Sequence, residues 1–111
     1  MEVRSEPLTP IAFDILLCLA DGEAHGYAIM QSLRESRTSG RMHAGTLYRA
    51  LARLVDAGLI EEADDPVDTE SDERRRYYAI TEQGRGAARA EAKRLEAKVG
   101  AARTLGLLGP A

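Results

Sequence analysis

Arginine is the residue type whose spacing in this sequence could do the most specific chemistry. Between Arg34 and Arg53 the chain carries five arginines, at positions 34, 37, 41, 49 and 53, and a single acidic residue, Glu35. Arginine side chains bind phosphate groups and pair with guanine through two hydrogen bonds, so this segment is a candidate surface for nucleic acid. A second basic group, Arg74 to Arg76, follows later in the chain.

The segment between these two basic groups carries the opposite charge. Residues 61–73 contain eight acidic residues and no basic one. A run of like charge is as typical of a solvated surface as of a functional one. In a DNA-binding protein, we expect such a segment to point away from the phosphates or to discourage non-specific binding.

Other residue types offer little catalytic chemistry. No nucleophile has a histidine at a suitable spacing, no glycine-rich phosphate loop is present, and no pair of carboxylates falls on a rigid element. The two histidines and the single cysteine show no metal-ligand spacing, and the acidic run lacks the pattern of a calcium loop. We therefore expect no enzyme activity and no cofactor. Cys18 is expected to be a small buried hydrophobe, and His25 to make a local hydrogen bond.

Length and composition favour one globular domain. The 111 residues are 44% hydrophobic and 30% charged, with a net charge of −3, which argues against a generally basic surface. No apolar run approaches the roughly 18–20 residues of a membrane span, and the first ten residues lack the apolar core of a signal peptide. One cysteine cannot form an internal disulfide. A cytoplasmic protein that does not enter a membrane is the expectation.

Three helices are predicted in the first half of the chain. Thr9 is a suitable N-cap and Pro10 suits the first helical position, and Asp21-Gly22 ends this helix. Further helices are expected over residues 25–36 and 44–57. Their apolar stripes are Ile11, Ile15, Leu16 and Leu19 in the first helix, widened by Leu17; Tyr27, Met30 and Leu33 in the second; and Leu47, Leu51, Leu54 and Val55 in the third.

The second half predicts a hairpin followed by a long helix. Residues 59–62 and 77–80 have the composition of strands, and Thr81 is a suitable N-cap for a helix that continues through Lys98 or as far as Arg103. The predicted fold is mainly α with a two-stranded β-wing, that is, a winged helix-turn-helix with a C-terminal dimerisation helix. The expected parts are residues 1–81 for DNA binding, 82–105 for dimerisation and 106–111 as a frayed tail.

The third helix is the expected recognition helix. With its apolar stripe turned inward, Thr46, Arg49 and Arg53 point outward together, and Gly45 lies where free N–H groups attract phosphate. The candidate DNA-binding residues are Arg41, His43, Gly45, Thr46, Tyr48, Arg49, Arg53, Arg74, Arg75 and Arg76. The alternative for Arg49 and Arg53 is that they are ordinary solvated residues.

A stripe on the last helix predicts a homodimer. Ala88, Ala92, Leu95, Val99 and Ala102 are spaced as a coiled-coil seam of about two heptads. Because two heptads are too short to hold a dimer alone, the first helix, including Ile11, should contribute to the interface. The alternative is that the stripe packs on its own domain.

Several motifs resemble the PadR-type transcriptional regulators in their short form. They are ILLCLADG at 15–22, HGY at 25–27, GTLY at 45–48, LARLVDAGLI at 51–60, RRRYY at 74–78, and Ile80-Thr81 followed by Gly84. The resemblance covers roughly residues 8–100. It implies a homodimeric repressor whose third helix reads an inverted repeat, with Thr46, Tyr48 and Arg49 near DNA and the basic triplet near phosphates.

The resemblance also implies control of efflux, detoxification or stress genes, with release of DNA when a small molecule binds. Some members hold flat ligands between aromatic side chains, but this chain has no tryptophan and no aromatic residue in its last helix. The inducer, the operator and the regulated genes are therefore left open. A second hypothesis is a winged-helix module that binds a protein partner, which the net negative charge and the acidic wing favour.

Overall fold

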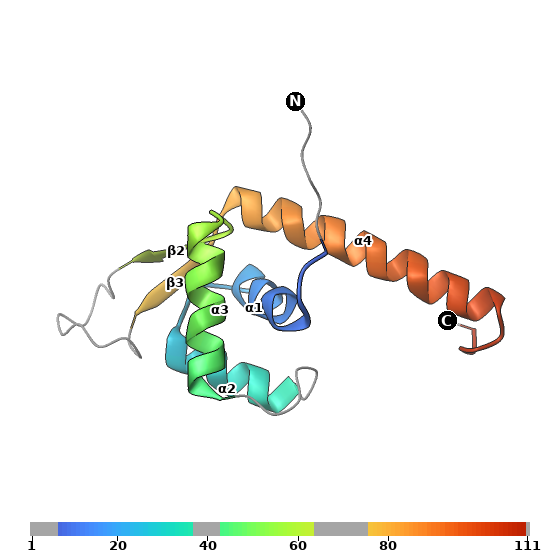
Figure 1. Cartoon of the computed structure of the whole chain (residues 1–111), viewed down its shortest axis with the longest axis horizontal. Coiled ribbons are helices and arrows are strands. Elements are labelled where there is room, and N and C mark those ends of the chain that lie inside the picture. The colour runs from blue at the N-terminus through green and yellow to red at the C-terminus, as the bar shows by residue number, and fades with distance from the viewer. Residues whose placement is uncertain (1–6, 37–42, 64–75, 111) are drawn as a thin grey trace.

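The computed structural model describes residues 7–36, 43–63 and 76–110. The described elements are mainly helical, with a small antiparallel sheet at one end and a long C-terminal helix (Figure 1). They are α1 (Pro10–Ala20), β1 (Ala24–His25), α2 (Gly26–Ser36), α3 (Ala44–Asp56), β2 (Ile60–Ala63), β3 (Tyr77–Ile80) and α4 (Glu82–Thr104). This order of helices and wing strands confirms the predicted fold class.

The predicted helix starts of α1 and α4 are confirmed by their caps. The Thr9 hydroxyl accepts a hydrogen bond from the Ala12 N–H at 3.2 Å, and Pro10 occupies the first turn of α1. The Thr81 hydroxyl accepts from the Gly84 N–H at 3.0 Å and donates to the Gly58 carbonyl at 2.7 Å. Thr81 therefore both starts α4 and ties that start to the turn after α3.

The core lies between α1, α2, α3 and the inner face of the sheet. Its members are Ile15, Leu16, Leu19, Ile29, Met30, Leu33, Leu47, Leu51, Leu54, Ile60 and Tyr78. The prediction that Tyr27 is buried was wrong: it is 64% exposed, and Ile29 fills the core instead. At 3.6 residues per turn, positions 27 and 33 lie about 120° apart around a helix, so they cannot share its buried centre.

The sheet has three strands rather than the two predicted. Its order is β1-β3-β2, with Ala24 opposite Tyr78 in β3 and Glu62 of β2 on the other side of the same residue. The Gly26 N–H donates to the Arg76 carbonyl at 3.0 Å. This bond holds the start of α2 next to the residue that precedes β3. The loop predicted between the wing strands, at residues 64–75, lies outside the described residues.

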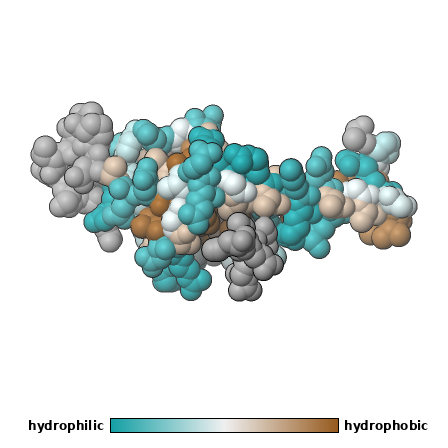
Figure 2. Space-filling view, turned by 90° about the horizontal axis from the view of Figure 1, so that it is seen from above, coloured by the Kyte–Doolittle hydropathy of each residue, from teal (hydrophilic) through white to brown (hydrophobic). Residues whose placement is uncertain are grey.

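A close contact at Gly84 fixes the approach of α4 to the domain. A Cβ atom at this position would stand 2.0 Å from the Leu59 carbonyl oxygen, so only glycine fits. The first half of α4 then packs against α1 and β3. Its second half projects beyond the other elements, and hydrophobic residues gather at its far end (Figures 1 and 2). Within the described ranges, no helix is long and apolar enough to cross a lipid bilayer.

Candidate nucleic-acid interface

The two sides of α3 differ sharply in burial. Leu47, Leu51 and Leu54 are buried on one side, whereas Thr46, Arg49 and Arg53 are exposed on the other. The exposed side begins at the helix N-terminus, where the Arg49 guanidinium reaches back to within 3.5 Å of the place that a Cβ of Gly45 would occupy. The packing of the leucines therefore holds a basic surface outward on a rigid element, as the sequence predicts.

Tyr48 lies on the flank of α3 and is half-buried. Its ring packs on Gly26 so closely that a Cβ there would stand 3.0 Å from the ring carbon Cε1. This contact joins α3 to the start of α2, a packing role that the sequence analysis did not predict. The contribution of Tyr48 to DNA binding stays a prediction.

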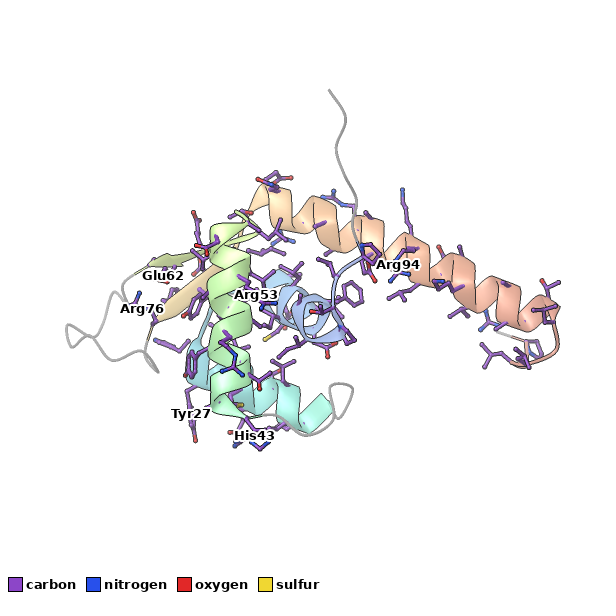
Figure 3. The ribbon with its side chains drawn as sticks, in the orientation of Figure 1. Tyr27, His43, Arg53, Glu62, Arg76 and Arg94 are labelled. Carbon is purple, nitrogen blue, oxygen red and sulfur yellow. The ribbon has the colours of Figure 1, made fainter. Side chains whose placement is uncertain are left out.

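The residues before α3 are only partly described. His43 is exposed and precedes the helix with an extended backbone, and its side chain makes no capping hydrogen bond. Its ring therefore does not cap the helix, and it projects from the N-terminal end of α3 (Figure 3). Arg41 lies outside the described residues.

The wing presents Arg76 next to an acidic partner. Arg76 is exposed directly before β3, and its guanidinium forms an ion pair with the carboxylate of Glu62 in β2 (Figure 3). A phosphate would have to compete with Glu62 for this arginine. Arg74 and Arg75 lie outside the described residues, so their placement stays a prediction.

A hollow of about 1380 Å³ lies between the N-terminal part of α1, one flank of α3 and the first half of α4. Leu8, Ile11 and Leu54 contribute apolar surface to it, and Thr46, Arg49 and Arg53 border it from α3. The projecting side of α3 is thus not covered by α4, and its basic residues are accessible to solvent.

The predicted dimer residues fall into two groups. Ile11 and Ala88 are partly buried against the core of their own domain. Ala92 and Val99 are exposed, and Leu95 and Ala102 are partly exposed. The part of the stripe beyond Glu91 thus has an unoccupied apolar side. The prediction that Leu17 widens the apolar stripe of α1 was wrong: Leu17 is 51% exposed on the outer face of α1, and Phe13 beside it is half-buried.

A buried carboxylate joins α4 to the N-terminal segment, and the sequence analysis did not identify it. Glu91 accepts a hydrogen bond from the Leu8 N–H at 3.1 Å and forms an ion pair with Arg94. The side-chain hydrogen bond from Arg94, followed by the bond from Leu8, lowers the pKa of Glu91. The hydrogen bond to Glu91 in turn raises the pKa of Arg94. The pair fixes the entry of α1 against the middle of α4.

The described residues offer no cluster of three or more histidine, cysteine or carboxylate side chains suited to a metal ion. The geometry combines a helix with an exposed basic side, an adjacent wing and a projecting helix. The sequence pattern of the transcriptional regulator PadR-like family matches residues 15–90. The chain belongs to this family. Its members are regulators of transcription rather than enzymes.

Solved structures of regulators share this fold. A PadR family transcription regulator from Clostridium difficile is 24% identical, with a TM-score of 0.75 over 87% of this chain and 98% of that one. RosR of H. salinarum is 30% identical, with a TM-score of 0.64 over 87% of this chain and 79% of that one.

Bacillus subtilis PadR, solved in complex with operator DNA, is 22% identical, with a TM-score of 0.60. That match covers 72% of this chain and 45% of the Bacillus protein, so it supports the shared fold alone. Among curated proteins, none matches this chain.

Proposed function

We propose that this PadR-family protein is a homodimeric repressor that binds an inverted-repeat operator, with α3 in the major groove and the wing beside the phosphates. The observation that carries the proposal is the exposed pair Arg49 and Arg53 on a helix whose opposite side is buried in the core. A helix supported in this way can enter the major groove without losing its own packing. Arg49, nearer the helix start, reads a base, and Arg53 contacts the backbone.

A second copy supplies the other half of the site. The distal half of α4, with Leu95, Val99 and Ala102, has an apolar side that its own domain does not cover. The exposed Leu17 and the half-buried Phe13 give α1 a second apolar surface that a second copy can cover. Two copies joined here would present two recognition helices, and a spacing of about 34–36 Å, one turn of DNA, matches two half-sites of a palindrome.

Selection of bound sites from a random DNA pool, with the full chain, tests the proposal. We expect enrichment of an inverted repeat with half-sites about 10–10.5 base pairs apart, centre to centre. The affinity for that site should fall linearly with the logarithm of salt concentration, with a slope near −0.9 for each phosphate contacted.

The competing hypothesis of a protein-interaction module predicts a different result. The negative net charge and the exposed Glu61 and Glu62 of β2 favour it. Under that hypothesis the pool yields no enriched sequence, and any DNA retention is weak and independent of sequence. Such a result would overturn the assignment of α3 as a reader of bases.

A further inference from the structure

The hollow between α1, α3 and α4 has walls of small and aliphatic side chains. Half-buried residues from all three helices line it, among them Ile11, Ala50 and Ala90, together with the buried Leu54. Among the described residues that line it, none is aromatic. Its volume of about 1380 Å³ exceeds the roughly 300–1,000 Å³ of common small-molecule sites. Such walls suit a flexible aliphatic body, whereas a flat ring would find no aromatic partner there.

Positive charge borders this apolar surface from two sides. Arg49 and Arg53 line the hollow from α3, and Lys93 and Arg94 line it from α4. Glu91 is the one acidic residue in the described lining, and it forms an ion pair with Arg94. Arg49, Arg53 and Lys93 therefore give the hollow a surplus of positive charge, and all three side chains are exposed.

The positions of the cations suit a ligand with one charged end. Arg53 projects from the edge of α3 nearest α1, and Arg94 lies where α4 meets the segment before α1 (Figure 3). An anionic group between α3 and α4 would lie near cations from both helices, and an attached apolar chain could bury itself against Ile11 and Ala90. A molecule with two apolar ends, or with a positive end, lacks this complementarity.

We propose that the hollow binds the anion of a fatty acid, with its carboxylate near Arg49, Arg53 and Lys93 and its alkyl chain on the aliphatic walls. Guanidinium groups hold carboxylates through two parallel, charge-assisted hydrogen bonds. Burial of the alkyl chain supplies affinity in proportion to the apolar area removed from water. The site is thus assigned from charge at one border and aliphatic lining elsewhere.

Occupation of this site regulates DNA binding by direct competition, a consequence that rests on the proposed function. Arg49 and Arg53 are the residues proposed to bind the operator, and a guanidinium held by a carboxylate is not available to a base or a phosphate. No change of shape is needed. Since binding free energies are reciprocal, the operator must weaken fatty-acid binding by the same factor by which the fatty acid weakens operator binding.

Titration calorimetry of the full chain without DNA tests the site itself. Octanoate, decanoate and dodecanoate, each below its aggregation concentration, should bind with an affinity that rises by about fourfold for each further CH₂ buried. Decyltrimethylammonium has the same chain as decanoate with a positive end, and it should bind at least tenfold more weakly. Equal binding of the two would overturn the role of the cations.

Two variants and a charge-matched control locate the ligand. Lys93→Gln should weaken decanoate binding by about fivefold, whereas Lys98→Gln, which removes the same charge from an exposed position of α4 outside the hollow, should not. Ala90→Leu fills part of the hollow and should weaken decanoate binding by about tenfold or more with operator affinity unchanged. Equal losses in the two lysine variants, or wild-type decanoate binding in Ala90→Leu, would overturn the site.

Competition is measured on the selected operator. Saturating decanoate should weaken operator binding at least tenfold, and a saturating operator should weaken decanoate binding by the same factor. Decanoate binding with no effect on the operator would overturn the competition. Absence of decanoate binding by the wild type, as when a second copy covers the hollow, would overturn the site. Failure to select any operator would instead overturn the proposed function, and the titration without DNA would still decide the site.

Discussion

α3 and the distal half of α4 both expose much of their surface, but for different physical reasons. α3 is exposed on one side only, and its other side contributes three buried leucines to the core. In the part of the chain that the structure describes, the distal half of α4 projects beyond the other helices and strands, and its apolar residues Leu95 and Val99 remain partly accessible. The apolar side of α3 is therefore buried within its own domain, whereas the apolar side of distal α4 is left accessible.

This difference separates two kinds of exposed surface. The accessible residues of α3 are charged and lie on a helix that tertiary packing already stabilises, so they are available to a ligand. The accessible residues of distal α4 are small or apolar, and a helix in water gains most of its stability from burying such a face. We therefore expect α3 to bind DNA and distal α4 to pack against a second copy of the chain.

The largest expected effect is on dimerisation, from substitutions in the apolar surface of distal α4. Leu95→Asp or Val99→Asp places an unpaired charge in the proposed dimer seam and should weaken dimerisation by about 3–5 kcal/mol. Light scattering should then report a monomer at micromolar concentration. Ala97→Asp, which adds the same charge on the opposite side of α4, is the control and should leave a dimer. Intact dimers of both seam variants would place the interface elsewhere.

A smaller effect is expected from the exposed side of α3. Arg49→Ala should weaken binding to the selected operator by about 1–3 kcal/mol and relax the base preference at one position. Arg49→Lys is the matched comparison, because it keeps the charge but loses the two-pronged hydrogen bonding of the guanidinium. Equal weakening for all sequences, or full recovery with lysine, would make Arg49 a phosphate contact.

Glu91 joins α4 to the segment before α1, and its contribution to the free energy of unfolding should depend on pH. The pKa of Glu91 lies below its ordinary value of 4.5, so the folded state favours the ionised carboxylate. This stabilisation is fully present above pH 4.5 and is lost as the pH falls through the lowered pKa of the folded state. Glu91→Gln keeps an acceptor for the Leu8 N–H but removes the charge.

Denaturant unfolding at several pH values measures this contribution. The wild type should lose more of its free energy of unfolding between neutral pH and pH 3 than Glu91→Gln does. Parallel curves for the two proteins would show that the pair of Glu91 and Arg94 contributes nothing to stability.

The smallest effect is expected at the wing. Glu62→Gln breaks the exposed ion pair with Arg76, which contributes about 0.2–1 kcal/mol, and removes one carboxylate that competes with phosphate for this arginine. DNA affinity should rise slightly and the salt slope should steepen. Glu61→Gln, which removes a neighbouring charge without breaking the pair, is the comparison. An equal rise in both variants would assign the effect to net charge alone.

Local chemistry predicted the helical framework well. Thr9, Pro10 and Thr81 begin their helices because a hydroxyl acceptor and a missing N–H suit the first turn in any context. The leucine spacing of α3 predicted its buried side, and from that its exposed basic side. These features depend on residues three or four positions apart, and sequence periodicity reports such distances directly.

Features that join distant segments were not predictable in this way. β1 is two residues long, too short for any alternation, and exists because β3 offers it a partner. The bond from the Leu8 N–H to Glu91 joins positions 83 residues apart. The close approach of the Leu59 carbonyl to Gly84 likewise joins two segments that lie apart in the chain.

The sequence by itself determined where α1 and α4 begin, which apolar residues of α3 fill the core, and that a basic side of α3 faces outward. Only the tertiary structure decided that β1 forms beside β3, that Glu91 is buried, and that the second half of α4 projects beyond the other elements. The physical reason is that caps and apolar stripes act within one or two helical turns. The burial of a single side chain depends instead on which distant backbone comes to lie beside it.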